Sequence, residues 1–214
     1  MVPGLAPRME FGAGESHHLL HVIRLARGEI VAVTDGDGGR GEAELVEVID
    51  GRAVLALRAE LAIETVPERT VLLGVPRAAL LEEALTLGTE CGATSFLLVR
   101  ARHSPPGEPR VERLARVLRA AVTQCGRATV PALAIASLSE AITRTGDGSR
   151  WIATPRAHPP SPSPVATVAI GPEGGWAGAE QDALHAAGFV PCGLGPHVQR
   201  TPTAVAAALA RLSL

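Results

Sequence analysis

Lysine, asparagine and tyrosine are absent from this 214-residue chain, so all 20 of its basic residues are arginine. A GC-rich genome accounts for this bias, because it also favours alanine, glycine and proline codons. Selection of arginine for phosphate contacts is the weaker explanation, since the arginines are scattered. The formal net charge is −2, so overall charge does not indicate a nucleic-acid binder. Any binding of nucleic acid by this chain would have to use a local basic face.

Cysteine is scarce, and long apolar runs are missing. Cys91, Cys125 and Cys192 are far apart and form no C-x-x-C pair, which argues against a zinc site or a disulfide framework and favours buried thiols. No apolar run is long enough to cross a membrane, and no signal sequence is recognisable. We therefore expect a cytoplasmic protein, without membrane association, whose 46% hydrophobic residues form the core of one or two domains.

The N-terminal part has the pattern of a small antiparallel sheet or barrel. Residues 29–58 alternate apolar and polar side chains, and the alternation is interrupted at Asp35–Gly39 and at Asp50-Gly51, which are strong hairpin signals. A short helix is expected before them at residues 16–25, with Ser16 as its N-cap. Leu19, Val22 and Ile23 would share one face of that helix.

After Pro67 the pattern changes to alternating strands and helices, which predicts a mostly parallel sheet covered on both faces, an α/β fold. The expected strands are residues 70–75, 94–99, 132–136, 151–154, 165–170 and 190–194. The expected helices are residues 77–90, 109–124, 139–144, 178–187 and 203–212. Residues 157–164 include four prolines and are expected to form an exposed loop. The predicted domains are residues 1–66 and 67–214.

Two strand–loop–helix segments carry the chemical signal. In the first, residues 169–176 read Ala-Ile-Gly-Pro-Glu-Gly-Gly-Trp. Its three glycines allow a tight bend and a close approach to a ligand, and a helix N-terminus follows. In the second, residues 194–204 read Leu-Gly-Pro-His-Val-Gln-Arg-Thr-Pro-Thr-Ala. There Thr201 or Thr203 can cap the last helix and Pro202 suits its first turn. Taken singly, each is compatible with an ordinary βα turn.

Together the two segments resemble the C-terminal signature of the bacterial 16S rRNA uracil-N3 methyltransferases. The resemblance extends over nearly the whole chain, because weaker matches occur in the family's order. These are residues 17–19, 22–25, 28–29, 35–36, 103–104, 124–127 and 130–131, with Glu90 and Gly92.

The resemblance implies a PUA-like β-barrel followed by a SPOUT methyltransferase domain with a C-terminal trefoil knot. The implied cofactor is S-adenosylmethionine (SAM), the protein is expected to be a homodimer, and no metal is needed. The product would be N3-methyluridine in the decoding region of 16S rRNA of the small ribosomal subunit.

Carried over by position, the resemblance also implies site residues. The cofactor would be bound by Thr154, Pro155, Gly171, Pro172, Glu173, Gly174, Gly175, Leu194, Gly195, Val198, Arg200, Thr201, Thr203 and Ala204. Arg24, Arg102 and Arg127 are candidates for RNA contact, although Arg24 and Arg127 can equally be surface arginines.

Methylation at uracil N3 requires alignment with the SAM methyl group and loss of the N3 proton. Arg200 can stabilise the resulting anion, unless it is a structural partner of Glu173. Glu173 or His197 can remove the proton, but a carboxylate beside a helix N-terminus is made less basic. Arg200 and Glu173 are therefore the catalytic candidates, and the base stays open.

The chain departs from the family pattern at several positions. Pro202 replaces a usual glutamate, Thr86-Leu87 a Gln-Lys pair, His103 an arginine that Arg102 can replace, and Thr123 a glutamate. These changes concern the substrate and the rate more than the fold. His17 and His21 are four residues apart, but no further ligand completes a metal site.

Two other functions remain open from the sequence. The chain can be a SPOUT methyltransferase with another RNA target, which Pro202 and Thr86-Leu87 favour. It can also be a diverged RNA-binding dimer without activity, which the glycine-rich Gly171–Gly175 turn argues against. SAM affinity separates the enzymes from the binding protein.

Overall fold

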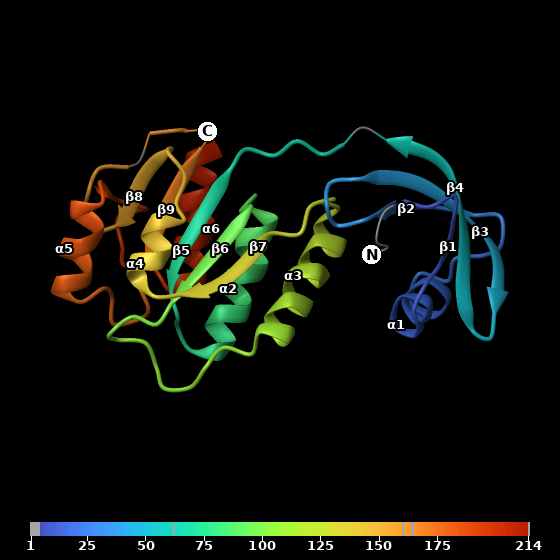
Figure 1. The fold of residues 1–214 in the computed structure, drawn as a ribbon, viewed down its shortest axis with the longest axis horizontal. Coiled ribbons are helices and arrows are strands. Elements are labelled where there is room, and N and C mark those ends of the chain that lie inside the picture. Colours follow the sequence, from blue (N-terminus) through green and yellow to red (C-terminus); the bar gives the residue numbers. More distant parts are fainter. Residues whose placement is uncertain (1–4, 62, 160, 164, 214) are drawn as a thin grey trace. The chain divides into compact units, whose positions relative to one another are not determined.

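The computed structural model describes residues 5–61, 63–159, 161–163 and 165–213, and the chain divides into two compact units (Figure 1). Unit 1 comprises Met1–Thr65 and Gly126–Val130, and unit 2 comprises Val66–Cys125 and Pro131–Leu214. The Glu64 carboxylate accepts hydrogen bonds from the backbone N–H groups of Ala128 (2.8 Å) and Thr129 (2.9 Å). These bonds tie residues 126–130 to unit 1. The predicted division after residue 66 instead assigned these five residues to the second domain.

Unit 1 is built on a four-stranded antiparallel sheet in the order β1-β4-β3-β2. Its strands are β1 (Arg8–Glu10), β2 (Ile30–Thr34), β3 (Arg40–Ile49) and β4 (Arg52–Leu61). Asp50 and Gly51 both have positive φ, 48° and 77°, as a two-residue hairpin turn requires. The predicted antiparallel sheet is therefore confirmed, and the sequence missed β1.

The N-terminal helix differs from its prediction. It begins at Ala13, as α1 (Ala13–His17), and continues as the π-helical turn η1 (His18–Val22). Ser16 is not the N-cap but is fully buried: its hydroxyl donates to the Phe11 carbonyl and accepts from the Ala53 N–H. Leu19 is buried, whereas Val22 and Ile23 are 61% and 48% exposed. The prediction of one apolar face shared by these three residues was therefore wrong, because only Leu19 packs into the hydrophobic core of unit 1.

Unit 2 contains the predicted parallel sheet, with strand order β10-β8-β9-β5-β6-β7. The observed strands and helices of this unit begin and end within two residues of every predicted boundary. The strands are β5 (Arg69–Gly74), β6 (Ser95–Val99), β7 (Ala132–Ala136), β8 (Ser149–Ala153), β9 (Ala166–Ile170) and β10 (Val190–Cys192). The helices are α2 (Ala78–Glu90), α3 (Val111–Cys125), α4 (Leu138–Thr143), α5 (Gly178–Ala186) and α6 (Thr201–Ser213).

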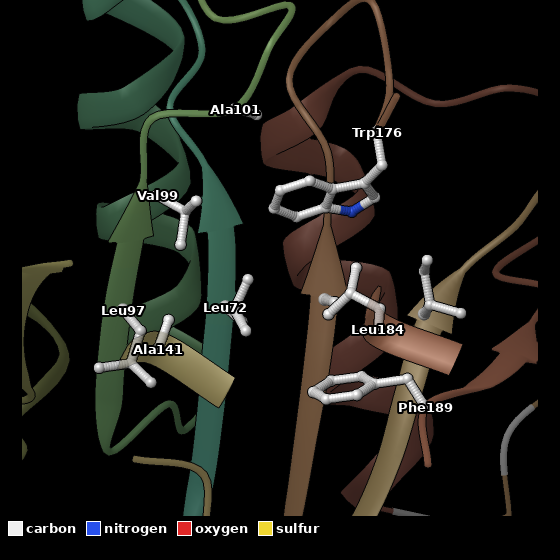
Figure 2. Packing of buried hydrophobic residues seen from close by; sticks show 10 residues of the cluster. Leu72, Leu97, Val99, Ala101, Ala141, Trp176, Leu184 and Phe189 are labelled. Carbon is white, nitrogen blue, oxygen red and sulfur yellow. The ribbon is translucent and has the colours of Figure 1, made fainter. Parts of the chain in front are cut away.

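Helices cover both faces of this sheet. In Figure 1, α4 and α5 lie on one face and α2 and α6 on the other, with α3 packed beside α2. Figure 2 shows the core on the α4 and α5 side of the sheet, where Leu72 and Leu97 of the strands belong to the same buried cluster as Leu184 and Phe189. Every residue of β5 and β9 is buried, which explains the apolar runs Val71–Leu73 and Val168–Ile170 at their centres and ends. The α/β fold is confirmed, and the trefoil knot stays a prediction.

The described part of the proline-rich segment is a loop, as predicted. Residues 157–159 and 161–163 form neither helix nor strand, and Pro160 and Pro164 lie outside the described residues.

The three cysteines form no disulfide, but only Cys192 is fully buried, and Cys91 and Cys125 are half-buried. Burial raises the pKa of the Cys192 thiol to about 11, so this thiol stays protonated and inert at neutral pH.

Candidate active site

A cavity of about 590 Å³ lies in unit 2 at the carboxyl ends of β8, β9 and β10. Chain segments that follow three different strands form its wall, together with the beginnings of α2 and α6. Along the sheet, β6 and β7 continue to one side of β5, whereas β9, β8 and β10 continue to the other. Open α/β sheets bind ligands where the strand order reverses in this way. The reversal falls between β5 and β9, and residues that follow both strands line the cavity, Arg77 after β5 and Gly171 after β9, so the topology supports a ligand site at this edge of the sheet.

The loop after β9 forms one wall of the cavity. Gly175 has φ +70°, a conformation that residues with a side chain rarely adopt. A Cβ at Gly171 would lie 2.9 Å from the backbone nitrogen of Trp176, so the loop folds tightly onto itself. Outside the cavity, His103 Nδ1 lies 3.1 Å from the Gly175 carbonyl oxygen. The glycines thus allow the close backbone packing that the sequence predicted.

Glu173 in this loop pairs with Arg77 at the beginning of α2. Arg77 Nε donates to Glu173 Oε1 at 2.9 Å. Burial acts to raise the pKa of Glu173, but hydrogen bonds from its own backbone N–H and from Arg77 outweigh burial, and the pKa lies below its usual value. The carboxylate is therefore ionised at neutral pH and is a weak base. Arg77 was not predicted, although it follows a strand that ends at the same edge of the sheet.

The segment after β10 forms the opposite wall and leads into α6. Arg200 is the last residue before the helix, and its carbonyl accepts the hydrogen bond of Ala204 N–H at 2.9 Å. Its guanidinium is 66% exposed and lies 3.6 Å from Glu83 of α2. Glu83, and not Glu173, is thus its partner in this structure. Since α6 begins at Thr201, the predicted capping roles of Thr201 and Thr203 are wrong, and both lie inside the first turn.

The loop after β8 closes the cavity from a third side. The Thr154 backbone N–H donates to the Cys192 carbonyl at 2.8 Å, and the Gly193 N–H donates to the His158 carbonyl at 2.7 Å. These two bonds hold residues 154–158 against residues 192–195. Thr154, Pro155, Leu194 and Gly195 all line the cavity beside this junction.

The structure brings most of the predicted cofactor residues together around one cavity. Gly174 and Thr203 do not line it, because Gly174 packs against His103 and Thr203 is exposed on α6. His197 does line it. The lining residues that lie outside the predicted cofactor loops are Arg77, Leu80, Ile152, Ala153, Ile170, Trp176 and Gln181.

The three predicted RNA-contacting arginines lie apart from one another in the chain and differ in exposure. Arg102 belongs to unit 2, where it is exposed and its backbone N–H donates to Glu180 of α5 at 2.7 Å. Arg24 and Arg127 belong to unit 1. Arg24 is exposed, whereas Arg127 is only 9% exposed. This burial favours a structural role for Arg127.

Two kinds of feature are absent from the described part of the chain. It contains no group of three or more histidine, cysteine, aspartate or glutamate side chains arranged to hold a metal ion. None of its described helices is long and apolar enough to cross a membrane.

Two protein families match the chain. The family described as RNA methyltransferase domain matches residues 64–213, and the family described as RNA methyltransferase PUA domain matches residues 11–57. The first match covers more than half of the chain and includes every strand and helix that forms the cavity. The chain therefore belongs to the RNA methyltransferase family and has a PUA domain before its catalytic domain.

Within this family the chain is similar to proteins named ribosomal RNA small subunit methyltransferase E. The Synechocystis protein is 31% identical over 92% of this chain and 70% of its own length, and the Bacillus subtilis protein 27% over 97% and 90%. The structure of the Neisseria gonorrhoeae protein bound to S-adenosylmethionine has a TM-score of 0.88 and 25% identity, covering 98% of this chain and 93% of that one. The sequence resemblance to this family is thereby confirmed.

Proposed function

We propose that the protein is a SAM-dependent methyltransferase that methylates N3 of a uridine in 16S rRNA of the small ribosomal subunit. The observation that carries the proposal is the convergence of the Gly171–Gly175 loop and the Leu194–Ala204 segment on one cavity. The names of the relatives support ribosomal RNA of the small subunit as the substrate. The N3 position follows from the motif resemblance.

The cavity fits SAM in size and in chemistry. Its volume of about 590 Å³ lies in the range of pockets that enclose small molecules, roughly 300–1,000 Å³. The narrow turn at Gly171 brings backbone groups to the wall, where they can bind the adenine and ribose. We propose that the loops after β8, β9 and β10 bind the cofactor, as the SAM-bound relative of similar fold suggests.

The residues of this chain would act mainly by positioning. When bound, SAM supplies an activated methyl group, and uracil N3 has to approach it in line. Arg200, at the rim of the cavity, is placed to stabilise negative charge on the uracil as N3 loses its proton. Glu173 neutralises Arg77 and holds the glycine loop against α2. His197 remains a candidate base because it lines the same cavity.

The direct test is methyl transfer from labelled SAM to purified small ribosomal subunits from a strain that lacks this enzyme, followed by nucleoside analysis. N3-methyluridine in the 16S rRNA is the expected product. SAM binding with a different methylated nucleoside would favour a SPOUT enzyme with another RNA target. Absence of SAM binding in calorimetry would favour the non-catalytic RNA-binding dimer.

The lowered pKa of Glu173 makes a prediction about pH. A carboxyl group with a pKa below its usual value is ionised throughout the neutral range, so its titration cannot shape the rate between pH 6 and 9. Glu173→Gln is therefore expected to leave the shape of the pH–rate profile unchanged and to lower the rate by less than about 10-fold. Loss of about 10²- to 10⁴-fold, the usual contribution of a general base, would instead identify Glu173 as the base.

We also propose that the protein is a homodimer and acts in the cytoplasm, where ribosomal subunits are found. The sequence resemblance implies a dimer, and Val198 at the cavity rim is 82% exposed, as expected for an apolar side chain that a partner subunit covers. Light scattering at micromolar concentration is expected to give twice the chain mass of 22.1 kDa. A monomeric mass would contradict the dimer.

A further inference from the structure

Positive charge is concentrated on the outward face of α3. Residues 110–119 contain four arginines and one glutamate, a net charge of +3, whereas the whole chain has −2. Arg113, Arg116 and Arg119 are exposed, on the side away from the buried Leu114 and Leu118. Three-residue spacing advances each arginine by about 4.5 Å along the helix and turns it by only about 60° around the axis. The three therefore form one continuous strip, here called the α3 arginine face.

The α3 arginine face differs from an ordinary solvated helix surface. Solvated faces usually alternate the two signs of charge, but after Glu112 no acidic residue follows on α3. Arg113 donates to Glu82 of α2 at 3.0 Å. Arg116 and Arg119 take part in none of the ion pairs found among the described residues. Two exposed guanidinium groups thus lack an acidic partner.

The α3 arginine face is connected to the active-site cavity through one helix. Glu82 and Glu83 are adjacent on α2: Glu82 binds Arg113 of the α3 arginine face, and Glu83 lies 3.6 Å from Arg200 at the cavity rim. Figure 1 shows α3 directly beside α2 in unit 2. A polynucleotide that presents a base near Arg200 can therefore continue across α2 to α3 within the same unit.

We propose that the α3 arginine face binds the phosphate backbone of the substrate RNA next to the target nucleotide. This inference rests on the proposed function, because it assigns the RNA-binding surface of the same site. Guanidinium groups bind phosphate oxygens in bidentate geometry, and unpaired exposed ones need no protein ion pair to be broken first. The surface also supplies the local basic face that a chain of net charge −2 requires to hold RNA.

The test compares Arg116→Gln, Arg119→Gln and the double variant with Arg144→Gln, a control at the end of α4 on the opposite face of the sheet. Binding of a 16S rRNA transcript is measured across salt concentrations. Each lost phosphate contact is expected to reduce the slope of log affinity against log salt by about 0.7. The double variant then binds about 25-fold more weakly at 0.1 M salt. An Arg116→Lys, Arg119→Lys variant restores most of the affinity, and all variants bind SAM like the wild type.

The outcomes separate this inference from the proposed function. If the double variant binds RNA with the same affinity and slope as the control while the wild type methylates 16S rRNA, the α3 arginine face is only solvated and the inference is wrong. If the slope falls as expected but the wild type yields no N3-methyluridine, the RNA surface stands and the proposed reaction is wrong. Unaltered melting of the double variant excludes misfolding as the cause.

Discussion

Arg200→Ala is expected to reduce methyl transfer by about 10²- to 10³-fold, the usual effect of removing one group that stabilises developing charge. Uracil N3 acquires negative charge as it loses its proton, and Arg200 is the exposed cation before α6 at the cavity rim. Its partner Glu83 lies at 3.6 Å in a solvent-exposed pair. Such pairs contribute little to stability, so the variant is expected to fold normally.

The measurement is single-turnover methyl transfer together with calorimetry of SAM binding. SAM affinity is expected to change by less than about threefold, because backbone groups of the loops provide most of the proposed cofactor contacts. Arg200→Lys retains the charge but not the planar fork, and is expected to recover part of the rate. Turnover of Arg200→Ala equal to that of the wild type would remove Arg200 from the mechanism.

Gly193→Ala is expected to weaken SAM binding by at least about 10-fold. A Cβ at this position would lie 2.0 Å from the Ala157 carbonyl oxygen, so one of the two backbone segments has to move. Both segments lead directly into the cavity wall, at Thr154-Pro155 and at Leu194-Gly195. Overpacking of this kind also costs about 1–3 kcal/mol of the free energy of unfolding.

Calorimetry and chemical denaturation on the same samples check both parts of this prediction. Gly178→Ala is the matched control, because a Cβ at Gly178 meets nothing within 4 Å and the residue begins α5. The control is expected to keep SAM affinity and to change stability by less than about 0.5 kcal/mol. Wild-type SAM affinity in Gly193→Ala would show that the junction between residues 154–158 and 192–195 does not shape the site.

The parallel sheet and its helices were predictable because their signals are local. Apolar runs such as residues 70–75 and 165–170 mark buried strands, and helices of suitable length separate them. The prediction failed where the signal was short or misleading. Strand β1 has three residues, and Ser16 has the sequence context of an N-cap although it is buried between Phe11 and Ala53.

The site was predictable to the extent that it follows from a loop's own sequence. The glycines of Gly171–Gly175 indicated a tight turn, and the turn closely packs on itself. The partners of the charged residues were not predictable. Glu173 binds Arg77 from a position 96 residues away, and Arg200 lies near Glu83. Such pairs depend on which strand ends become neighbours, and the order of the strands in the sheet, β10-β8-β9-β5-β6-β7, differs from their order in the chain.

The sequence by itself determined the α/β fold class, the glycine-rich Gly171–Gly175 loop, the Leu194–Ala204 segment with Arg200, and the family of the chain, because short-range periodicity and spaced motifs encode each of them. Only the tertiary structure decided that Arg127 is buried, that Thr203 points away from the cavity, and that Gly193 faces the Ala157 carbonyl. The physical reason is the same in each case. Burial and contact depend on residues far away in the chain, whose distance from a given side chain is fixed only when the sheet has assembled.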